Sequence, residues 1–332
     1  MKITVLSDGS WGTALAMTLL DNGHNVSMWG PFPDYLEQMA KTRENSRFLP
    51  GVKLSAQLVL EKDMAKAVTG SELILLASPT QYTRGVLRQF KPYFIPAQHA
   101  LVNVAKGIEN DTLFRVSCIC AEELGDCRYA VLSGPSHAEE VSRKAPTAVV
   151  AASADQQLAE LVQSTFMNDF FRVYTSSDVI GVELGGALKN VMAIAAGIID
   201  GMKLGDNPKA AMMTRGIAEM GRLGAALGGE PVTFSGLSGI GDLIVTCCSG
   251  HSRNRHVGEE LGRGKNIEDI LAAMGMVVAE GVKTTLSAWS LAEKHSVDTP
   301  IINQIYAILY QNKNPKLAIK ELMARSAKPE LG

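Results

Sequence analysis

The chain has 332 residues, of which 46% are hydrophobic and 20% are charged, and its formal net charge is −2 at pH 7. Its length is sufficient for two domains, and its apolar content excludes an intrinsically disordered protein. A net charge near zero provides no general attraction to nucleic acid or to an anionic membrane, so an anionic ligand needs a local site. The five cysteines show neither disulfide nor zinc-site spacing, which predicts reduced thiols and no metal centre.

The first 30 residues follow the order strand, turn, helix, strand. Ile3–Leu6 and His24–Trp29 are short apolar runs that predict strands, and Thr13–Asp21 is predicted to be helical. No signal-peptide pattern precedes the first run, which points to a cytoplasmic protein. This order is typical of the βαβ unit that binds dinucleotides.

The turn in this unit carries Ser7-x-Gly9-x-x-Gly12, a variant of Gly-x-Gly-x-x-Gly. Gly9 and Gly12 stand at the positions where the backbone approaches a pyrophosphate and where the helix packs on the strand. Ser7 replaces the first glycine, so an ordinary strand-to-helix turn remains an alternative to nucleotide binding.

The end of the second strand bears on the choice between NAD and NADP. Dinucleotide sites carry there an acidic residue for the ribose of NAD or an arginine for the 2′-phosphate of NADP. This chain has Gly30, Pro31 and Phe32 instead. The motif therefore does not distinguish NAD from NADP.

Further apolar runs predict a larger sheet over residues 1–176. The predicted strands are 73–77, 100–104, 130–132, 148–151 and 171–174, with a helix over 81–90. Such alternation indicates an α/β class protein with a Rossmann-type, doubly wound and mostly parallel sheet. Ligands bind such sheets at the carboxyl ends of the strands, where three loops would lie: 7–12, 106–107 and 133–138.

Residues 177–332 show no convincing strand and predict an all-α domain. The expected helices are 178–201, 207–227, 234–247, 252–263, 281–295, 298–311 and 315–325. We assign 1–176 to a dinucleotide-binding domain and 177–332 to a helical domain.

The segment 181–200 is predicted to be one long helix that is apolar around most of its circumference. Lys189 lies on this helix above a floor of Gly and Ala, which predicts open space over its side chain. Gly185 and Gly186 destabilise a helix, which suggests that another group approaches closely there. A membrane span would bury Glu183 and Lys189 in lipid, which disfavours it. The alternative to a functional lysine is one whose side chain merely extends to the protein surface.

Two loops of the helical half carry reactive side chains. The segment 234–243 contains several glycines and presents Asp242. The segment 249–256 places Ser252, Arg253, Asn254 and Arg255 together, a donor set suited to a phosphate. A solvated basic helix start is the alternative for the two arginines. His251 and His256 have no partner set for a metal and are expected to be bystanders.

Longer motifs carry a family resemblance. GSWGTALA at 9–16, SGPSHAEEV at 133–141, VELGGALKN at 182–190, FSGLSGIGDLIVTC at 234–247 and HSRN at 251–254 resemble those of bacterial NAD(P)-dependent sn-glycerol-3-phosphate dehydrogenases. GDNPKAAMMTRGIAEMGRLG at 205–224 fits the same pattern, and the match extends over about residues 1–325.

The resemblance implies a cytoplasmic enzyme, usually a homodimer, that reduces dihydroxyacetone phosphate to sn-glycerol 3-phosphate for phospholipid synthesis. It implies catalysis by Lys189, with Lys106 and Asp242 positioning the substrate. Residues matching the cofactor site are Gly9, Ser10, Trp11, Gly12, Pro31, Phe32, Lys106, Ala138, Arg253, Val278 and Glu280. Residues matching the substrate site are Lys106, Gly134, Ser136, Lys189, Asp242, Ser252, Arg253 and Asn254.

Departures from the family concentrate on the cofactor side. Ser7 and Asp8 replace a usual Gly-Ala, and Pro31 and Phe32 replace a basic pair that can meet the 2′-phosphate. We therefore expect NADH to be used at least as well as NADPH. Two rival functions stay open: a β-hydroxyacid or phosphogluconate dehydrogenase, and a catalytically silent nucleotide-binding sensor.

Overall fold

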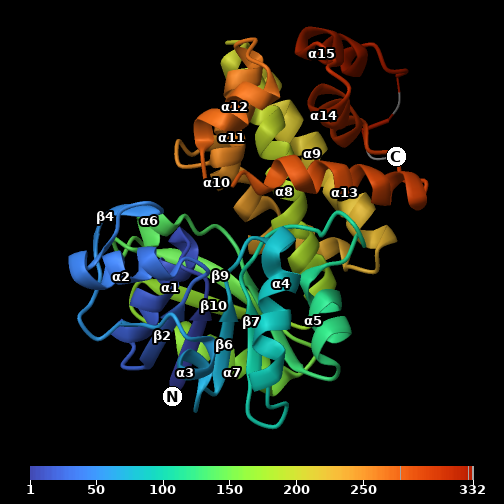
Figure 1. Ribbon diagram of the computed structural model, residues 1–332. Coiled ribbons are helices and arrows are strands. Elements are labelled where there is room, and N and C mark those ends of the chain that lie inside the picture. Colours follow the sequence, from blue (N-terminus) through green and yellow to red (C-terminus); the bar gives the residue numbers. More distant parts are fainter. Residues whose placement is uncertain (277, 328, 331–332) are drawn as a thin grey trace.

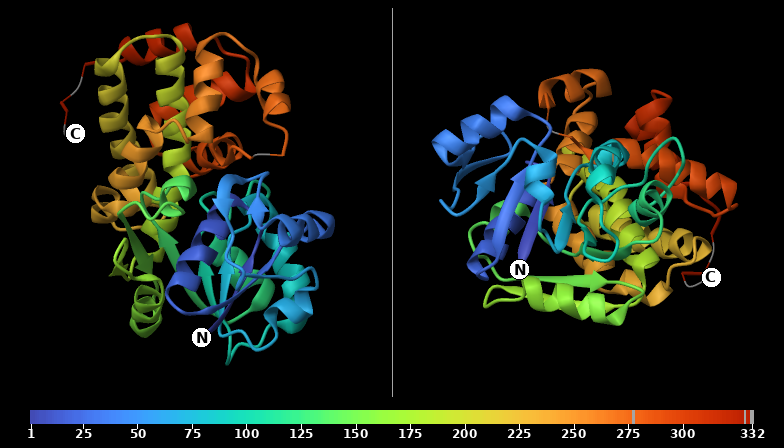
Figure 2. Two further views of the ribbon diagram at one scale, coloured as in Figure 1. Left: turned by 90° about the vertical axis from the view of Figure 1, so that its left-hand side faces the viewer. Right: turned by 60° about the horizontal axis from the view of Figure 1, so that its bottom comes forward.

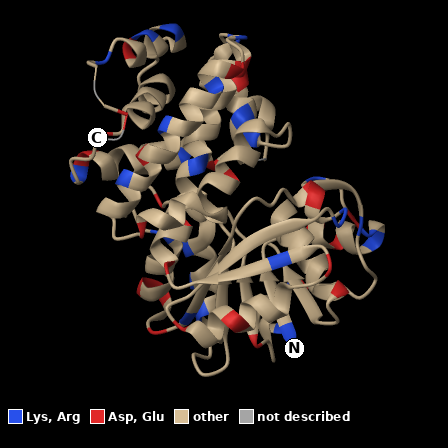
Figure 3. Ribbon diagram, turned by 180° about the vertical axis from the view of Figure 1, so that it is seen from behind, with Lys and Arg blue, Asp and Glu red and all other residues tan. Residues whose placement is uncertain are grey.

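The computed structural model describes residues 1–276, 278–327 and 329–330. It has two lobes, an α/β sheet lobe and a helical lobe, shown one above the other in Figure 1 and in the left view of Figure 2. Basic and acidic residues are interspersed over both lobes (Figure 3).

The sheet lobe contains ten strands and seven α-helices. Its strands are β1 (Lys2–Leu6), β2 (Asn25–Trp29), β3 (Glu44–Asn45), β4 (Leu49–Lys53), β5 (Val59–Leu60), β6 (Leu73–Leu76), β7 (Ala100–Asn103), β8 (Arg128–Ser133), β9 (Thr147–Ala152) and β10 (Phe171–Ser176). Its helices are α1 (Ser10–Asp21), α2 (Pro33–Thr42), α3 (Met64–Val68), α4 (Thr80–Phe90), α5 (Val116–Leu124), α6 (Ala138–Val141) and α7 (Gln156–Phe166), with a 3-10 turn at Lys91–Tyr93.

The main sheet has eight strands in the order β10-β9-β8-β7-β6-β1-β2-β5. All neighbouring pairs are parallel except β8 and β9, so the prediction of a mostly parallel sheet is confirmed. The chain leaves β1 on one side toward β2 and later returns on the other side at β6. The carboxyl edge next to β1 is therefore the switch point at which ligands bind in such folds.

The helical lobe begins with α8 (Val179–Gly201), which runs out of the sheet lobe and through the centre of the second lobe (Figure 1). The other helices are α9 (Asp206–Ala226), α10 (Asp242–Cys248), α11 (Arg253–Gly262), α12 (Ile267–Met274), α13 (Glu280–Lys294), α14 (Pro300–Tyr310) and α15 (Pro315–Met323). Helix α8 is the one helix in the described residues that is long and apolar enough to cross a membrane, with a mean hydropathy of 1.5, and it is buried within the protein.

Two details of the helical prediction are wrong. The predicted helix 234–247 is broken into a 3-10 turn at Pro231–Ser235, a π-helical turn at Leu237–Gly241 and α10. Gly239 permits the close backbone approach in this segment, because a Cβ there would lie 2.1 Å from the Phe234 carbonyl oxygen. Helix α12, which Asn266 caps, was not predicted. In the sheet lobe, helices α2, α3, α5, α6 and α7 and strands β3–β5 were not predicted either.

Helices α8 and α11 approach each other through glycine. A Cβ at Gly197 would lie 1.9 Å from the Arg255 carbonyl oxygen. In the other direction, a Cβ at Gly258 would lie 2.0 Å from the Ile194 carbonyl oxygen. Both helices repeat a glycine four residues later, at Gly201 and Gly262, and each of these also faces the partner backbone. This contact positions the start of α11 beside the Lys189 region of α8.

Candidate active site

A cleft of about 640 Å³ lies at the carboxyl edge of the sheet, between the two lobes. The β1–α1 turn, the loops after β6, β7 and β8, and helices α8, α10, α11 and α13 all contribute to its wall. The predicted site residues that line it are Gly9, Ser10, Trp11, Pro31, Phe32, Lys106, Ser136, Ala138, Lys189, Ser252, Arg253, Asn254, Val278 and Glu280.

The β1–α1 turn has the features that a dinucleotide pyrophosphate needs. Gly9 is the N-cap of α1, no side chain caps this helix, and its first turn has no acidic residue, so its backbone N–H groups and partial positive charge face the cleft. Gly12 lies behind the turn, where a Cβ would come within 3.1 Å of both Val5 and Ala77. Trp11 Nε1 is buried without a hydrogen-bond partner among the described residues. The residues present therefore fit a nicotinamide dinucleotide.

Lys189 lies on α8 with only 6% of its surface exposed. Its Nζ donates a 2.7 Å hydrogen bond to Thr246 Oγ1 and lies 3.0 Å from Asp242 Oδ1. Burial lowers the pKa of Lys189 to about 8, although the Asp242 carboxylate works in the opposite direction. A lysine with such a pKa can exist in both protonation states near neutral pH, which suits a proton donor and acceptor.

Asp242 holds two lysines at once. Lys106 Nζ donates to its Oδ2 at 2.6 Å and also to the carbonyl oxygen of Gly134 at 2.9 Å. Burial alone would raise the pKa of Asp242, but the ammonium groups of Lys106 and Lys189 hold it below its usual value. Lys106 Nζ further lies 3.4 Å from Ser136 Oγ. The loops after β7 and β8 are thereby joined to α10.

The small residues of α8 around Lys189 allow neighbouring groups to pack closely against the helix. A Cβ at Gly185 would lie 2.5 Å from the Ser238 carbonyl oxygen, and one at Gly186 would lie 2.8 Å from Ser133 Oγ. The expected close approach is therefore present. Part of the space predicted over the lysine is filled by these groups, while Lys189 itself lines the cleft.

The two arginines at the start of α11 lie in different surroundings. Arg253 is exposed and lines the cleft. Arg255 Nε lies 2.7 Å from Asp200 Oδ2, and Arg255 is not among the residues of the cleft. The prediction that both arginines share one site is therefore wrong. They follow each other at two positions along a helix and point in different directions.

Ser252 and Asn254 connect the cleft to the scaffold. Ser252 Oγ caps α11 by accepting from Arg255 N at 3.2 Å. Asn254 Nδ2 donates to Asn190 Oδ1, and Asn254 Oδ1 accepts from Gly281 N, both at 2.9 Å. Asn190 in turn donates to the carbonyl oxygen of Lys106 at 2.9 Å. This chain of amides links α8, α11 and α13 to the loop after β7.

Glu280 lies at the start of α13 and bridges to the sheet lobe. Its Oε1 accepts from Thr80 N at 2.9 Å, and burial raises its pKa. Three predicted site residues, Gly12, Gly134 and Asp242, do not line the cleft but lie directly behind residues that do.

Sequence reasoning missed several residues of the cleft, among them Thr246, His137 and Asn190. Thr246 follows Asp242 by four residues on α10, so helical spacing was the available signal. His251, expected to be a bystander, also lines the cleft, with its ring 6.0 Å from that of His137. No group of three His, Cys, Asp or Glu able to hold a metal occurs within the described residues.

Comparison with known proteins identifies the family. Residues 2–159 and 178–320 match the family models of the NAD-dependent glycerol-3-phosphate dehydrogenase N-terminus and C-terminus. Glycerol-3-phosphate dehydrogenase [NAD(P)+] of Bacillus velezensis is 50% identical, covering 98% of this chain and 94% of the relative, and that of Bacillus subtilis is 50% identical, covering 99% and 96%. A crystal structure of glycerol-3-phosphate dehydrogenase from Coxiella burnetii superposes with a TM-score of 0.94 at 38% identity, covering 98% of this chain and 99% of that one.

These matches span both lobes and include the glycine turn, the Lys189 helix and the Asp242 loop. The family matches agree with the cleft, whose residues fit a nicotinamide dinucleotide at one end and include Lys189, paired with Asp242, at the other. The chain belongs to the NAD-dependent glycerol-3-phosphate dehydrogenase family.

Proposed function

We propose that this protein interconverts dihydroxyacetone phosphate and sn-glycerol 3-phosphate with NAD(H) or NADP(H), and that Lys189 is its proton donor and acceptor. The observation that carries the proposal is the buried cluster of Lys189, Asp242 and Lys106 at the inner end of a cleft whose outer end fits the dinucleotide.

The bound nicotinamide supplies or accepts the hydride at C2 of the substrate. During reduction the C2 carbonyl oxygen gains negative charge, which the Lys189 ammonium stabilises before it gives up a proton to that oxygen. Asp242 holds Lys189 and Lys106 in place through its two oxygens. Lys106 is then directed at the substrate oxygens from the sheet side.

The substrate phosphate is held by the start of α11 in this proposal. Arg253 reaches into the cleft with its guanidinium not engaged in any ion pair recorded among the described residues. Ser252 and Asn254 fix the helix turn that carries it. Binding the phosphate at a distance from C2 orients the carbonyl toward Lys189. Gly134 and Ser136 complete this end of the site.

We assign residues 1–176 to cofactor binding and 177–332 to the substrate and the catalytic lysine. The last strand, β10, ends at Ser176 and the catalytic helix begins at Val179, which supports a boundary at this point. Lys106, Gly134 and Ser136 reach the substrate from the first domain. A cytoplasmic homodimer that supplies phospholipid synthesis completes the proposal, on the strength of the family resemblance.

The test is turnover by the purified protein. We expect NADH or NADPH oxidation with dihydroxyacetone phosphate and none with dihydroxyacetone at the same concentration, because the latter lacks the group that Arg253 holds. Oxidation of a 3-hydroxyacid with NAD+ and no reaction with the phosphate ester would favour the β-hydroxyacid dehydrogenase function. No turnover by a folded protein that still binds NADH would favour the sensor.

A further inference from the structure

The turn between β1 and α1 contains a buried carboxylate, Asp8, that the reaction proposed above does not use. Asp8 is 3% exposed, lines the cleft, and has an oxygen, Oδ2, without a hydrogen-bond partner among the described residues. A buried acceptor left unpaired is costly, so such groups usually serve a ligand or a switch. We therefore expect a hydrogen-bond donor of a ligand in the cleft to meet Asp8 Oδ2.

The side chain of Asp8 is directed toward the end of β2. A Cβ added to Gly30 would lie 2.6 Å from Asp8 Cγ and 2.8 Å from Asp8 Oδ2. The carboxylate thus packs on the backbone directly after Trp29, the last residue of β2. The end of the second strand is where dinucleotide-binding sheets carry the acidic residue that hydrogen-bonds the adenosine ribose. In this chain that position in the sequence has no acidic residue, and Asp8 brings a carboxylate to the same place from the neighbouring turn.

The backbone of the turn is adapted to this arrangement. Ser7 has a φ of +151°, a region that favours glycine. Its N–H donates to the Trp29 carbonyl oxygen at 2.9 Å, and its Oγ accepts from Gly9 N at 3.1 Å. Asn45 Nδ2 also donates a 2.7 Å hydrogen bond to the Asp8 carbonyl oxygen. Asp8 is thereby fixed on both sides, so its carboxylate is held in place before a ligand arrives.

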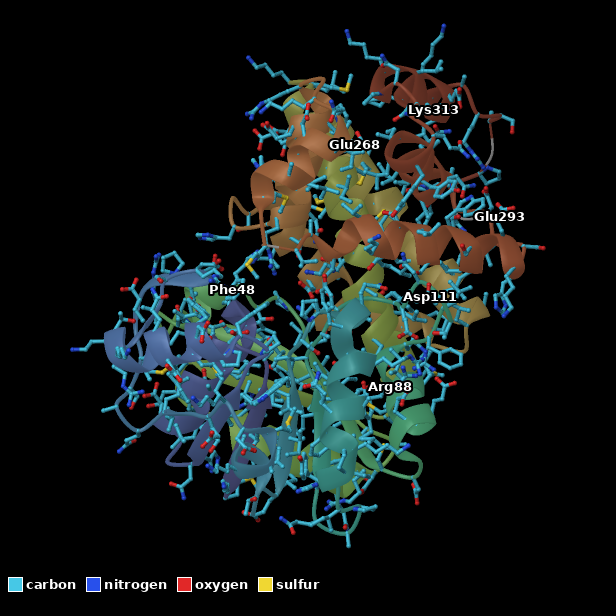
Figure 4. All side chains as sticks on the ribbon, in the orientation of Figure 1. Phe48, Arg88, Asp111, Glu268, Glu293 and Lys313 are labelled. Atoms are coloured by element: carbon cyan, nitrogen blue, oxygen red, sulfur yellow. The ribbon has the colours of Figure 1, made fainter. Side chains whose placement is uncertain are left out.

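One cation lies near this end of the cleft. Arg47 stacks over the ring of Tyr35 at 4.1 Å and lies 5.7 Å from the ring centroid of Phe32. Burial raises the pKa of Asp8, and a hydrogen bond from its own backbone N–H and the charge of Arg47 partly offset that rise. Arg47 is exposed and therefore screened by water, whereas Asp8 is buried, where charges interact more strongly. Figure 4 labels Phe48, a further ring beside Arg47, on the side of the sheet lobe that faces the helical lobe.

We infer that Asp8 is the cofactor-selecting residue of this protein: it accepts hydrogen bonds from the ribose hydroxyls of NAD(H) and repels the 2′-phosphate of NADP(H). The inference rests on the proposed function, because it concerns the cofactor of the same reaction. It assigns the preference to a residue of the glycine turn rather than to Pro31 and Phe32 after β2.

Binding measurements test this without catalysis. Isothermal titration with ADP-ribose and with 2′-phospho-ADP-ribose reports on the adenosine half alone. We expect the wild-type protein to bind ADP-ribose at least 10-fold more tightly. Asp8→Ala should weaken ADP-ribose and strengthen the 2′-phosphorylated probe, changing the ratio on the order of 100-fold, as expected for loss of hydrogen bonds to a charged group together with loss of like-charge repulsion.

Two variants complete the design. Asp8→Asn keeps the shape and can still accept a ribose hydroxyl, so ADP-ribose binding should be largely retained while the 2′-phosphorylated probe gains affinity. Asp34→Ala removes an equal charge from the exposed start of α2 and should leave the ratio unchanged. Equal weakening of both probes in Asp8→Ala, or tighter wild-type binding of the 2′-phosphorylated probe, would overturn the inference, the latter in favour of Arg47.

The two levels of failure are distinguishable. If neither probe binds the folded wild-type protein and no turnover occurs, the proposed function fails. If the protein turns over substrate but the ratio of the two affinities does not respond to Asp8, only the inference about Asp8 fails.

Discussion

Asp242 Oδ1 lies 3.0 Å from Lys189 Nζ, while the other oxygen of the same carboxylate holds Lys106 at 2.6 Å. One buried carboxylate therefore pairs with two lysines that approach from different lobes. The ammonium of Lys189 carries the reaction in the proposal, so its protonation should be visible in the kinetics.

Activity should follow the pKa of Lys189, which is about 8. The reduction of dihydroxyacetone phosphate needs the protonated lysine, so its kcat should fall as pH rises through about 8. The oxidation of glycerol 3-phosphate needs the neutral lysine, so its kcat should rise over the same range. Thr246→Val removes a hydrogen-bond acceptor from the Lys189 ammonium, which lowers the pKa of Lys189. The fall in kcat for reduction and the rise in kcat for oxidation should therefore both move to lower pH. If the two pH profiles of Thr246→Val match those of the wild-type protein, a group other than Lys189 controls them.

Replacement of Lys189 by Ala should lower kcat on the order of 10²- to 10⁴-fold while changing KM little, because a general acid acts in the transition state. Steady-state kinetics at saturating cofactor measure both constants. A raised KM with an unchanged kcat would show that Lys189 only binds substrate, and Lys106 would then be the candidate acid.

Asp242→Asn should destabilise the fold as well as impair the reaction. It leaves the buried Lys189 and the partly buried Lys106 without their counter-charge. Breaking a buried pair costs about 3–5 kcal/mol in the free energy of unfolding. Asp298→Asn is the matched control, because its ion pair with Arg325 is about half exposed and should contribute less than about 1 kcal/mol. Urea denaturation of the two variants compares them directly, and equal stabilities would contradict the buried cluster.

Substitutions of Arg253 and Arg255 should have different effects, the first on substrate binding and the second on stability. Arg253→Ala is expected to raise the KM for dihydroxyacetone phosphate on the order of 100-fold, since it removes a charged donor from the phosphate, with no loss of thermal stability. Arg255→Ala removes the ion pair with Asp200 and should lower the melting temperature while leaving KM nearly unchanged. The reverse pattern would place the phosphate elsewhere.

The glycine contact between α8 and α11 should be sensitive to a single methyl group. Gly258→Ala would force a Cβ against the Ile194 carbonyl oxygen and should lower the free energy of unfolding by about 3 kcal/mol. Gly221→Ala, in the interior of α9 with no neighbour near its Cβ position, should instead raise it by about 0.5–1 kcal/mol. Thermal and chemical unfolding of both variants would show the contrast.

Apolar runs identified the strands that form the buried centre of the sheet and the long helix α8, because most residues of these elements are apolar. The order of the parallel strands also placed the loops at 106–107 and 133–138 beside the glycine turn. The short edge elements were missed: β5 has two residues, one of them exposed, so no apolar run marks it. The break at Gly236–Gly241 was missed because it depends on how closely the backbone of Phe234 packs.

The sequence by itself determined the fold class and the family, and it predicted which lysine, aspartate and arginine carry the chemistry, because residue type and spacing along one element are local properties. Only the tertiary structure decided which charges meet. Thr246 and Asp242 reach Lys189 from another helix, Arg255 turns to Asp200, and Asp8 takes a place beside Gly30. Such pairings depend on the packing of segments distant in sequence, and neither composition nor periodicity encodes them.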